Sequence, residues 1–175
     1  LTLKRAHWWF AYTRGASEDV AAAGFPIDHI TVVGNAIDTQ ALRDQLAAVG
    51  PTELVAAREA LGWGAQDRVV VCCGSLHPNK HVDALIEASD AMHATDASLR
   101  LLVIGGGPGL PQVRALAASR PWVRCVGPQF GRELAVLLSL AELWLNPGLV
   151  GLGVLDAFCA GLPVITRDID VHSPE

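Results

Sequence analysis

Basic residues are scarce in this sequence, which contains 13 Lys and Arg against 18 Asp and Glu and has a formal net charge of −5. A general nucleic-acid-binding protein needs a basic face that neutralises phosphates. We therefore expect no nucleic-acid partner. A negative net charge still leaves room for one small basic pocket that binds a single diphosphate.

Cysteine is also sparse, with four residues and no C-x-x-C pair. Cys72, Cys73 and Cys125 lie in or beside apolar runs, and Cys159 lies in an apolar helical segment. In such places Cys behaves as a small hydrophobic residue. This usage argues against a disulfide framework or a zinc site, and it is typical of a protein in the reducing cytoplasm.

Long apolar runs are missing as well, since none reaches the roughly 18 residues that span a bilayer. No basic amphipathic helix suggests membrane binding, so we expect membrane contact only through a part of the protein outside this chain. The chain begins at Leu1 rather than Met, without a signal peptide, and stops at Glu175 after a strand-like segment. We therefore expect residues to be missing at both ends.

Several catalytic signatures are absent, including G-x-S-x-G, H-E-x-x-H and G-x-x-x-x-G-K-[ST]. The glycine tract at 104–113 fails the dinucleotide pattern because Leu110 stands where its last Gly would be. His77 and His81 are four residues apart, but Pro78 keeps this span out of a regular helix, so we expect a polar loop rather than a metal pair. His172 is expected to cap a helix.

What the sequence does contain is an alternation of short apolar runs and longer amphipathic segments. Helices are expected at 53–61, 81–93, 111–119 and 131–140 and after Gly153. This order predicts an α/β fold in which a Rossmann-like parallel sheet carries helices on both faces. The runs expected to form strands are 30–33, 69–73, 101–104, 123–126, 143–145 and 163–166.

Each strand expected in the main sheet is followed by a loop, and ligands of such sheets bind at the carboxyl ends of the strands. The loop GSLHPNK leaves a buried strand and places Lys80 beside a helix start. Small residues, a helix dipole and a cation together suit a phosphate group. A solvated Lys at a helix start is an equally good interpretation of this loop alone.

The stretch NPGLVGLGVLDAFCAGLPVIT, residues 146–166, is the most informative part of the chain. A strand is expected to end at Asn146, and Gly151 and Gly153 open a helix whose amides face outward to an anion. Asp156 is the one acid on that helix. Its carboxylate is suited to accept hydrogen bonds from the vicinal hydroxyls of a ribose.

Five segments, in order, resemble the donor half of glycosyltransferase family 4, which has the GT-B fold. They are GNAID, CCGSLHPNKHVDALIEA, LLVIGGGP, VRCVGPQ and the stretch that begins at Asn146. The resemblance covers nearly the whole chain. It implies that residues 1–34 are a remnant of the amino-terminal acceptor domain and the hinge. Residues 35–175 would then form the nucleotide-sugar-binding domain, incomplete at its carboxyl end.

The resemblance implies a retaining glycosyltransferase that moves a sugar from a nucleoside diphosphate sugar to a glycan or lipid-linked acceptor. The missing amino-terminal domain would hold the acceptor, no metal or other cofactor is expected, and this chain alone should bind the donor without turnover. Two alternatives stay open: a non-catalytic module that binds a nucleotide sugar, and a sugar epimerase with a GT-B-like fold. A dinucleotide-dependent oxidoreductase is disfavoured by the broken glycine pattern.

The resemblance also assigns roles to individual residues. Lys80 would hold the donor pyrophosphate and stabilise the leaving group, and Asp156 would hold the donor ribose, so these two are the expected catalytic residues. Further donor contacts are implied at Gly74, Ser75, Gly106, Cys125, Val126, Gly148, Val150, Gly151, Leu152 and Gly153.

Two positions depart from the family pattern. Ser75 stands where the family has a phosphate-binding Arg, and Gly148 stands where it has the first Glu of its Glu–seven residues–Glu motif. The chain thus lacks one cation and one carboxylate, which motivates the non-catalytic alternative. Far from these loops, Trp8, Trp9 and Phe10 are expected to anchor a core or a domain interface rather than to stack on a sugar.

Overall fold

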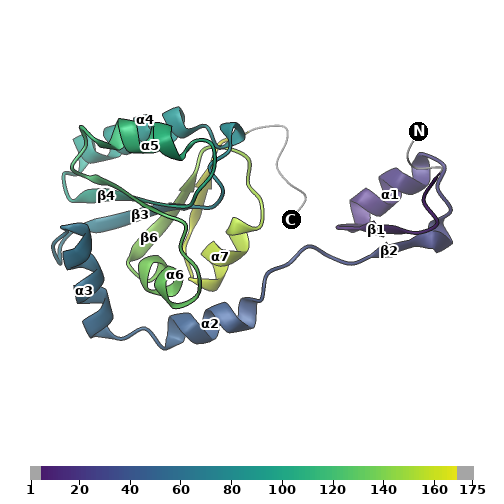
Figure 1. The fold of residues 1–175 in the computed structure, drawn as a ribbon, viewed down its shortest axis with the longest axis horizontal. Helices are drawn as coiled ribbons and strands as arrows, with labels where there is room; N and C mark the ends of the chain where they lie inside the picture. The colour runs from purple at the N-terminus through teal and green to yellow at the C-terminus, as the bar shows by residue number, and fades with distance from the viewer. Residues whose placement is uncertain (1–4, 169–175) are drawn as a thin grey trace.

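A computed structural model of the chain describes residues 5–168, which form two bodies joined by an irregular segment over 33–38 (Figure 1). The small amino-terminal unit contains β1 (Trp9–Ala11), α1 (Arg14–Ala22), a 3-10 turn η2 (Ile27–His29) and β2 (Ile30–Val32). Its two strands pair in parallel. Helix α1 covers one face of this two-stranded sheet (Figure 1).

The larger body is an α/β domain with a five-stranded parallel sheet in the order β5-β4-β3-β6-β7. The predicted Rossmann-like fold class is therefore confirmed. Its elements are α2 (Thr39–Ala47), α3 (Pro51–Leu61), β3 (Arg68–Cys73), η3 (Pro78–Lys80), α4 (Val82–Thr95), β4 (Leu99–Ile104), α5 (Leu110–Ala117), β5 (Val123–Gly127), α6 (Gly131–Leu138), β6 (Ala141–Asn146), α7 (Gly153–Cys159) and β7 (Val164–Thr166).

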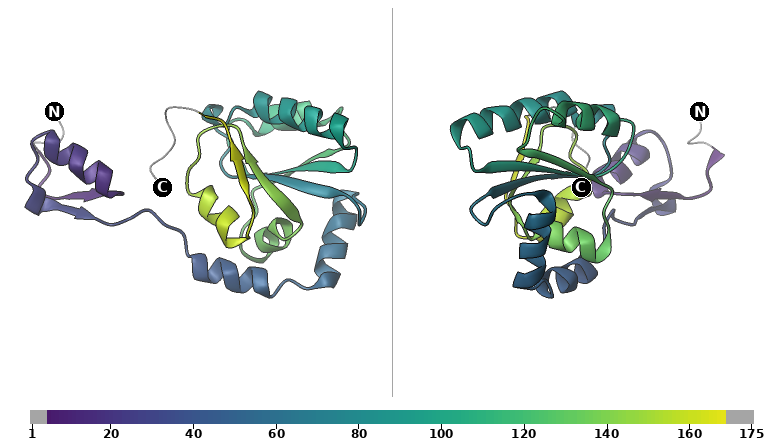
Figure 2. Two further views of the ribbon diagram at one scale, coloured as in Figure 1. Left: turned by 180° about the vertical axis from the view of Figure 1, so that it is seen from behind. Right: turned by 60° about the vertical axis from the view of Figure 1, so that its left-hand side comes forward.

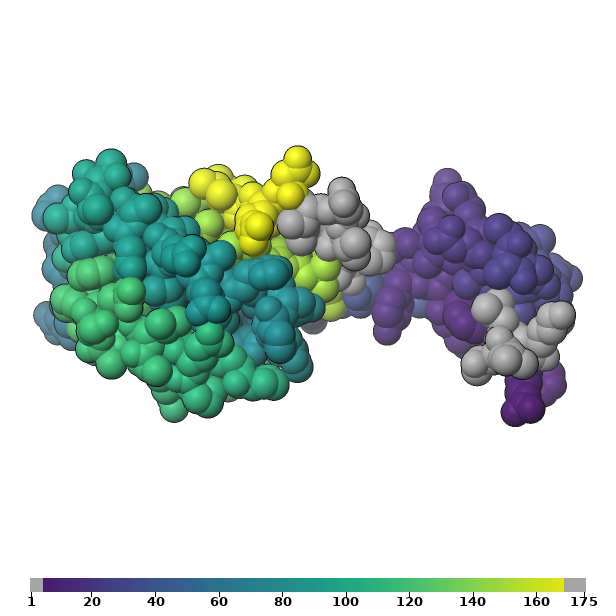
Figure 3. All heavy atoms as spheres, turned by 90° about the horizontal axis from the view of Figure 1, so that it is seen from above, coloured from purple at the N-terminus to yellow at the C-terminus, as the bar shows by residue number. Residues whose placement is uncertain are grey.

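The central strands β3 and β4 are buried on both faces, which explains why Val69–Cys73 and Leu101–Ile104 are apolar without interruption. On β3, Val69 and Val71 point into a core shared with α3, α6 and α7. Val70 and Cys72 point into a second core under α4 and α5. Figure 2 shows helices on the two sides of the sheet, and Figure 3 shows α4 and α5 covering one side.

The amino-terminal unit was less predictable than the domain. Trp9 packs edge-on against Phe25 at 6.1 Å between ring centroids, as a core residue would. Trp8 and Phe10 are 47% and 64% exposed, so the prediction that they anchor a core is wrong for the described residues. Side chains alternate along a strand, and α1 covers only the face that contains Trp9 and Ala11. An interface role for Trp8 and Phe10 stays a prediction.

The chain reverses its direction of travel across the sheet between β3 and β6. From β3 it moves outward to β4 and β5, and it then returns to the other side of β3 to add β6 and β7. Such a switch point leaves a crevice between the carboxyl ends of the two central strands, where ligands bind in open α/β sheets. In Figure 1 the turn η3, which follows β3, lies on the side of the domain nearest to the amino-terminal unit.

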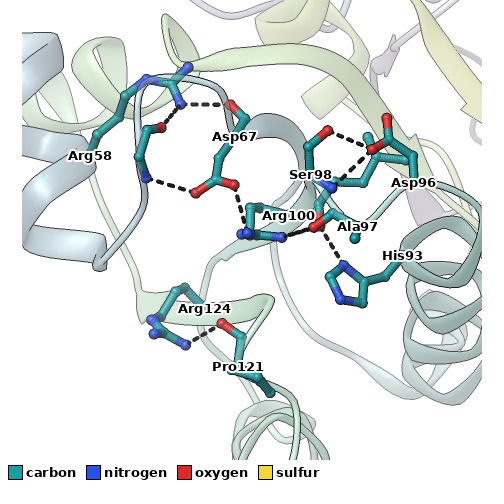
Figure 4. Close-up of polar contacts among 11 residues, drawn as sticks. Arg58, Asp67, His93, Asp96, Ala97, Ser98, Arg100, Pro121 and Arg124 are labelled. Carbon is teal, nitrogen blue, oxygen red and sulfur yellow. Dashed lines mark hydrogen bonds and ion pairs between the residues drawn. The ribbon is translucent and has the colours of Figure 1, made fainter.

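The opposite edge, where the strands begin, is closed by a network of paired polar groups (Figure 4). The Asp67 carboxylate accepts from the Arg100 guanidinium at 2.6 Å and from the Gly64 amide at 2.7 Å. Arg58 donates to the Asp67 carbonyl at 2.7 Å. The Asp96 carboxylate accepts from the hydroxyl and the amide of Ser98. These bonds tie the turns before β3 and β4 together.

Candidate functional site

Two adjoining pockets open at the carboxyl end of β3. The larger pocket, of about 470 Å³, lies between the ends of β3, β4 and β5 and the start of α6, and Asp156 of α7 lies on its wall. The switch-point pocket, of about 270 Å³, lies between the ends of β3 and β6 and is lined by Lys80 and Asn146. Cys73, Gly74 and Ser75 line both pockets, so one elongated ligand can occupy the two together.

Glycine at the strand ends permits the close contact of two loops beneath the larger pocket. A Cβ on Gly105 would lie 1.8 Å from the Gly74 carbonyl oxygen, and Gly105 has a φ of +149°. A Cβ on Gly106 would lie 2.9 Å from the Pro128 ring. The predicted contact residues Gly74, Ser75 and Gly106 are thereby brought together on one surface.

The far wall of the larger pocket consists of Pro128, Gln129 and Phe130, which the sequence interpretation did not single out. The Phe130 side chain is 76% exposed at the pocket, and the Gln129 amide nitrogen donates to the Val126 carbonyl at 3.2 Å. A polar and an aromatic residue directly after a strand end was an available signal, because bases are bound by stacking and by amide groups.

Cys125 and Val126 lie at an irregularity in the sheet. Val103 pairs with Cys125 and Ile104 pairs with Gly127, so Val126 is an extra residue on β5. The side chains of Cys125 and Val126 pack against the two cores. Their main chain is therefore the part that a ligand could reach, and their assigned contact with the base stays a prediction.

Lys80 ends the turn η3 and is separated from α4 by His81, which has the left-handed φ of +50°. The Lys80 ammonium donates to the Leu149 carbonyl at 2.5 Å. Partial burial lowers the pKa of Lys80, against the opposing effect of the Cys72 and Cys73 thiols. The ammonium group is thus held against the loop after β6, and Lys80 lines the switch-point pocket.

Gly148 has a physical reason to lack a side chain. A Cβ at this position would lie 2.3 Å from the Asn79 carbonyl oxygen and 2.4 Å from the Lys80 Cα. The amide of Leu149 also donates to Asn79 O at 2.9 Å, which holds the loop after β6 against η3. At the position of the family's first Glu, this chain thus has a glycine whose backbone packs against η3 and supports Lys80. Val150 lies two residues further along the same loop.

Helix α7 begins at Gly153, and Gly151, Leu152 and Gly153 line the switch-point pocket. One turn into α7, Asp156 faces the larger pocket. Desolvation by burial raises the pKa of its carboxyl group. Within residues 5–168 the Asp156 side chain has no hydrogen-bond or ion-pair partner, so its oxygens are available to the hydroxyl groups of a ligand.

Asn146 is the last residue of β6 and is only 6% exposed. Its amide nitrogen donates to the Leu149 carbonyl at 3.2 Å, the same oxygen that binds Lys80. Its Oδ1 atom is buried and has no partner among the described residues. The sequence interpretation used Asn146 only to mark the end of a strand, although a polar residue that ends the run LWLN was a signal.

The described residues contain no group of three or more His, Cys, Asp or Glu side chains able to hold a metal ion. The four cysteines all lie among the described residues and form no disulfide bond. Among the described helices none is long and apolar enough to cross a membrane. The helix cap predicted for His172 lies outside the described residues.

Comparison with known proteins adds a family match. The family model described as "Glycosyl transferases group 1" matches residues 67–175. A D-inositol 3-phosphate glycosyltransferase of Saccharomonospora viridis is 29% identical over 157 residues, which cover 81% of this chain and 35% of that protein. An alpha-monoglucosyldiacylglycerol synthase of Acholeplasma laidlawii is 25% identical over 125 residues, 68% of this chain and 31% of its own. The chain thus spans about a third of the length of these relatives.

Solved structures share the fold. The crystal structure of Anabaena HepE in complex with UDP and glucose has a TM-score of 0.69 at 18% identity, covering 93% of this chain and 45% of that one. WaaG, a glycosyltransferase involved in lipopolysaccharide biosynthesis, has a TM-score of 0.69 at 22% identity, with 91% and 44% covered. At these identities the likeness establishes the arrangement of the elements and nothing about the ligand.

Proposed function

Since the chain belongs to the family of group 1 glycosyl transferases, we propose that it contains the donor site of a retaining glycosyltransferase. The enzyme would transfer a sugar from a nucleoside diphosphate sugar to a glycan or lipid-linked acceptor. The observation that carries this proposal is the pair of joined pockets. One holds a cation and the other an unpaired carboxylate, across a shared floor of Gly74 and Ser75.

The diphosphate is assigned to the switch-point pocket. A phosphate oxygen that replaced the Leu149 carbonyl as partner of the Lys80 ammonium would form a stronger, charge-assisted bond. Negative charge develops on the departing nucleoside diphosphate, and a cation held there stabilises it in the transition state. Ser75 adds a hydroxyl group at the junction of the pockets but no charge.

The nucleoside is assigned to the larger pocket. Asp156 accepts from the ribose hydroxyls, and the base lies against Pro128 and Phe130 near the bulge at Val126. A raised pKa fits this role, because a half-buried carboxyl group that lacks a partner gains most when a hydroxyl donates to it.

Catalysis on this proposal comes from positioning and leaving-group stabilisation, without a metal. The acceptor is expected to approach from the side of η3 that faces the amino-terminal unit. The name of the relative from Acholeplasma laidlawii specifies an α-linked product. This supports retention of the anomeric configuration if the donor is also α-linked. Residues 1–34 are assigned to the acceptor half and its hinge.

Lys80→Ala tests the proposal. Calorimetric titration of the full chain with UDP, GDP, ADP and NAD should give binding of one nucleoside diphosphate. The variant should lower that affinity about 10- to 100-fold, the value of a hydrogen bond to a charged group. Arg120→Ala is the matched control, because Arg120 is bonded to Asp90 away from both pockets. Equal affinity in wild type and Lys80→Ala would refute the assignment.

A non-catalytic binding module is the second candidate, and the Ser75 and Gly148 departures favour it. It predicts that the full-length protein binds a nucleotide sugar normally and transfers none, with every donor and acceptor in a broad panel. Product formation with any pair, seen by mass spectrometry, would eliminate this candidate.

A further inference from the structure

We propose that Asn146 accepts a hydrogen bond from a hydroxyl group of the sugar that is transferred, and so sets affinity for the sugar separately from affinity for the nucleoside diphosphate. This inference rests on the proposed function. It adds a specificity-determining residue at the end of β6, next to the cation that holds the diphosphate.

The orientation of the Asn146 amide is fixed by the Leu149 carbonyl. Only the nitrogen of the amide can donate to that oxygen, so the 3.2 Å contact assigns Nδ2 to it. Oδ1 then points the other way, and it is buried with no partner among the described residues. Asn146 lines the switch-point pocket, so a ligand bound there is the candidate partner of Oδ1.

An acceptor of this kind selects the chemistry of its partner. A buried carbonyl oxygen without a hydrogen bond is unfavourable, and a group that donates to it recovers that loss. An ionised phosphate has only acceptor oxygens and cannot do so, whereas a sugar hydroxyl can. The unpaired Oδ1 therefore fits the sugar and not the diphosphate.

Asn146 lies where the diphosphate and the sugar of the donor would be linked. Its Nδ2 and the Lys80 ammonium both donate to the Leu149 carbonyl, so both side chains lie around one atom. A diphosphate at Lys80 would place its attached sugar beside Asn146. Gly148, which cannot accommodate a side chain against η3, supplies no side-chain acceptor, and Asn146 provides one from two residues earlier.

Asn146→Ala is the test, in the full chain. Titrations would use whichever of UDP, GDP or ADP binds, and the same nucleotide carrying glucose, galactose or N-acetylglucosamine. We expect wild type to bind at least one of the three sugars more tightly than the bare diphosphate. In Asn146→Ala that extra affinity should fall about 3- to 10-fold, the value of one neutral hydrogen bond, while the affinity for the diphosphate changes less than about 2-fold.

Ser89→Ala is the matched control, because Ser89 is also buried with an unpaired oxygen but lies on α4 in the core. It should change neither affinity, and circular dichroism melts of the variants verify folding. An extra sugar affinity that survives in Asn146→Ala, or no sugar preference in wild type, overturns the inference. Failure of the proposed function is distinguishable, since no nucleoside diphosphate would then bind to wild type at all.

Discussion

The two ends of the five-stranded sheet differ in how completely their polar groups are paired. At the amino ends of the strands, Asp67, Asp96 and Ser98 are bonded to neighbouring charges and amides (Figure 4). At the carboxyl ends, Asp156 has no partner within the described part of the chain, and Asn146 is paired through only one of its two polar atoms.

This difference separates stability from binding. In the paired network the polar groups keep hydrogen-bond partners in the folded protein, so none is left unsatisfied. Their bonds also fix the turns that precede the strands. Unpaired acceptors and a half-buried cation lower the stability of the free protein, and a ligand that satisfies them recovers that free energy on binding. Changes at the two ends should therefore affect different measurements.

The largest effect is expected from Gly148→Ala, because its new Cβ would overlap the backbone of Asn79 and Lys80. The two loops must separate, which displaces Lys80. We expect a loss of about 3 kcal/mol in the free energy of unfolding and about 100-fold in diphosphate affinity, measured by urea denaturation and calorimetry. Gly15→Ala is the control, since nothing lies within 4 Å of its Cβ. Unchanged binding in Gly148→Ala would mean that this contact does not position Lys80.

An intermediate effect, on stability and not on binding, is expected from Arg100→Ala. It leaves Asp67, whose side chain is 14% exposed, without its guanidinium partner. We expect the free energy of unfolding to fall by about 2 kcal/mol, between the values for exposed and buried pairs, while diphosphate affinity stays within about 2-fold of wild type.

Arg68→Ala is its matched control at the same end of the sheet. Arg68 pairs with Asp96 and Glu142 but its side chain is 54% exposed, so its removal should lower the free energy of unfolding much less than Arg100→Ala does. If either variant weakened diphosphate binding as strongly as Lys80→Ala, the division of roles between the two ends would be wrong.

The smallest effect is a difference in pH dependence. Burial raises the pKa of Asp156 above its ordinary value of 3.8, so its contribution to stability is present below that value and is lost as the pH rises through the folded pKa. The hydroxyl and amide of Ser98, followed by Arg68, lower the pKa of Asp96. Its contribution is present above 3.8 and is lost as the pH falls through the folded pKa.

Urea denaturation between about pH 3 and about pH 7 checks these signs. Relative to wild type, Asp156→Asn should gain stability as the pH rises, and Asp96→Asn should lose stability over the same range. Parallel curves for the two variants would contradict the contrast in their surroundings.

The domain was predictable because its central strands β3 and β4 are buried on both faces. Short, continuously apolar runs such as VVVCC and LLVI are typical of strands buried between two layers of helices. The structure extends these two runs by at most two residues at either end. The segment β1 was missed because WFA is too short to show a period and has one face uncovered by described residues.

At the site, the sequence identified the residues that carry charge, Lys80 and Asp156, and the structure places them in adjoining pockets. It could not show that Gly148 supports η3, because that contact joins segments nearly 70 positions apart. Nor could it show which atom of Asn146 is unpaired, since that depends on the path of the loop that follows.

Cys73 lies on the floor shared by both pockets, and burial raises the pKa of its thiol to about 12. Peroxides attack the thiolate and not the thiol, so this group should remain reduced at neutral pH. A sulfenic acid at Cys73 would obstruct both the larger pocket and the switch-point pocket. The same desolvation that makes the pocket receptive to a ligand should therefore keep it working through oxidative stress.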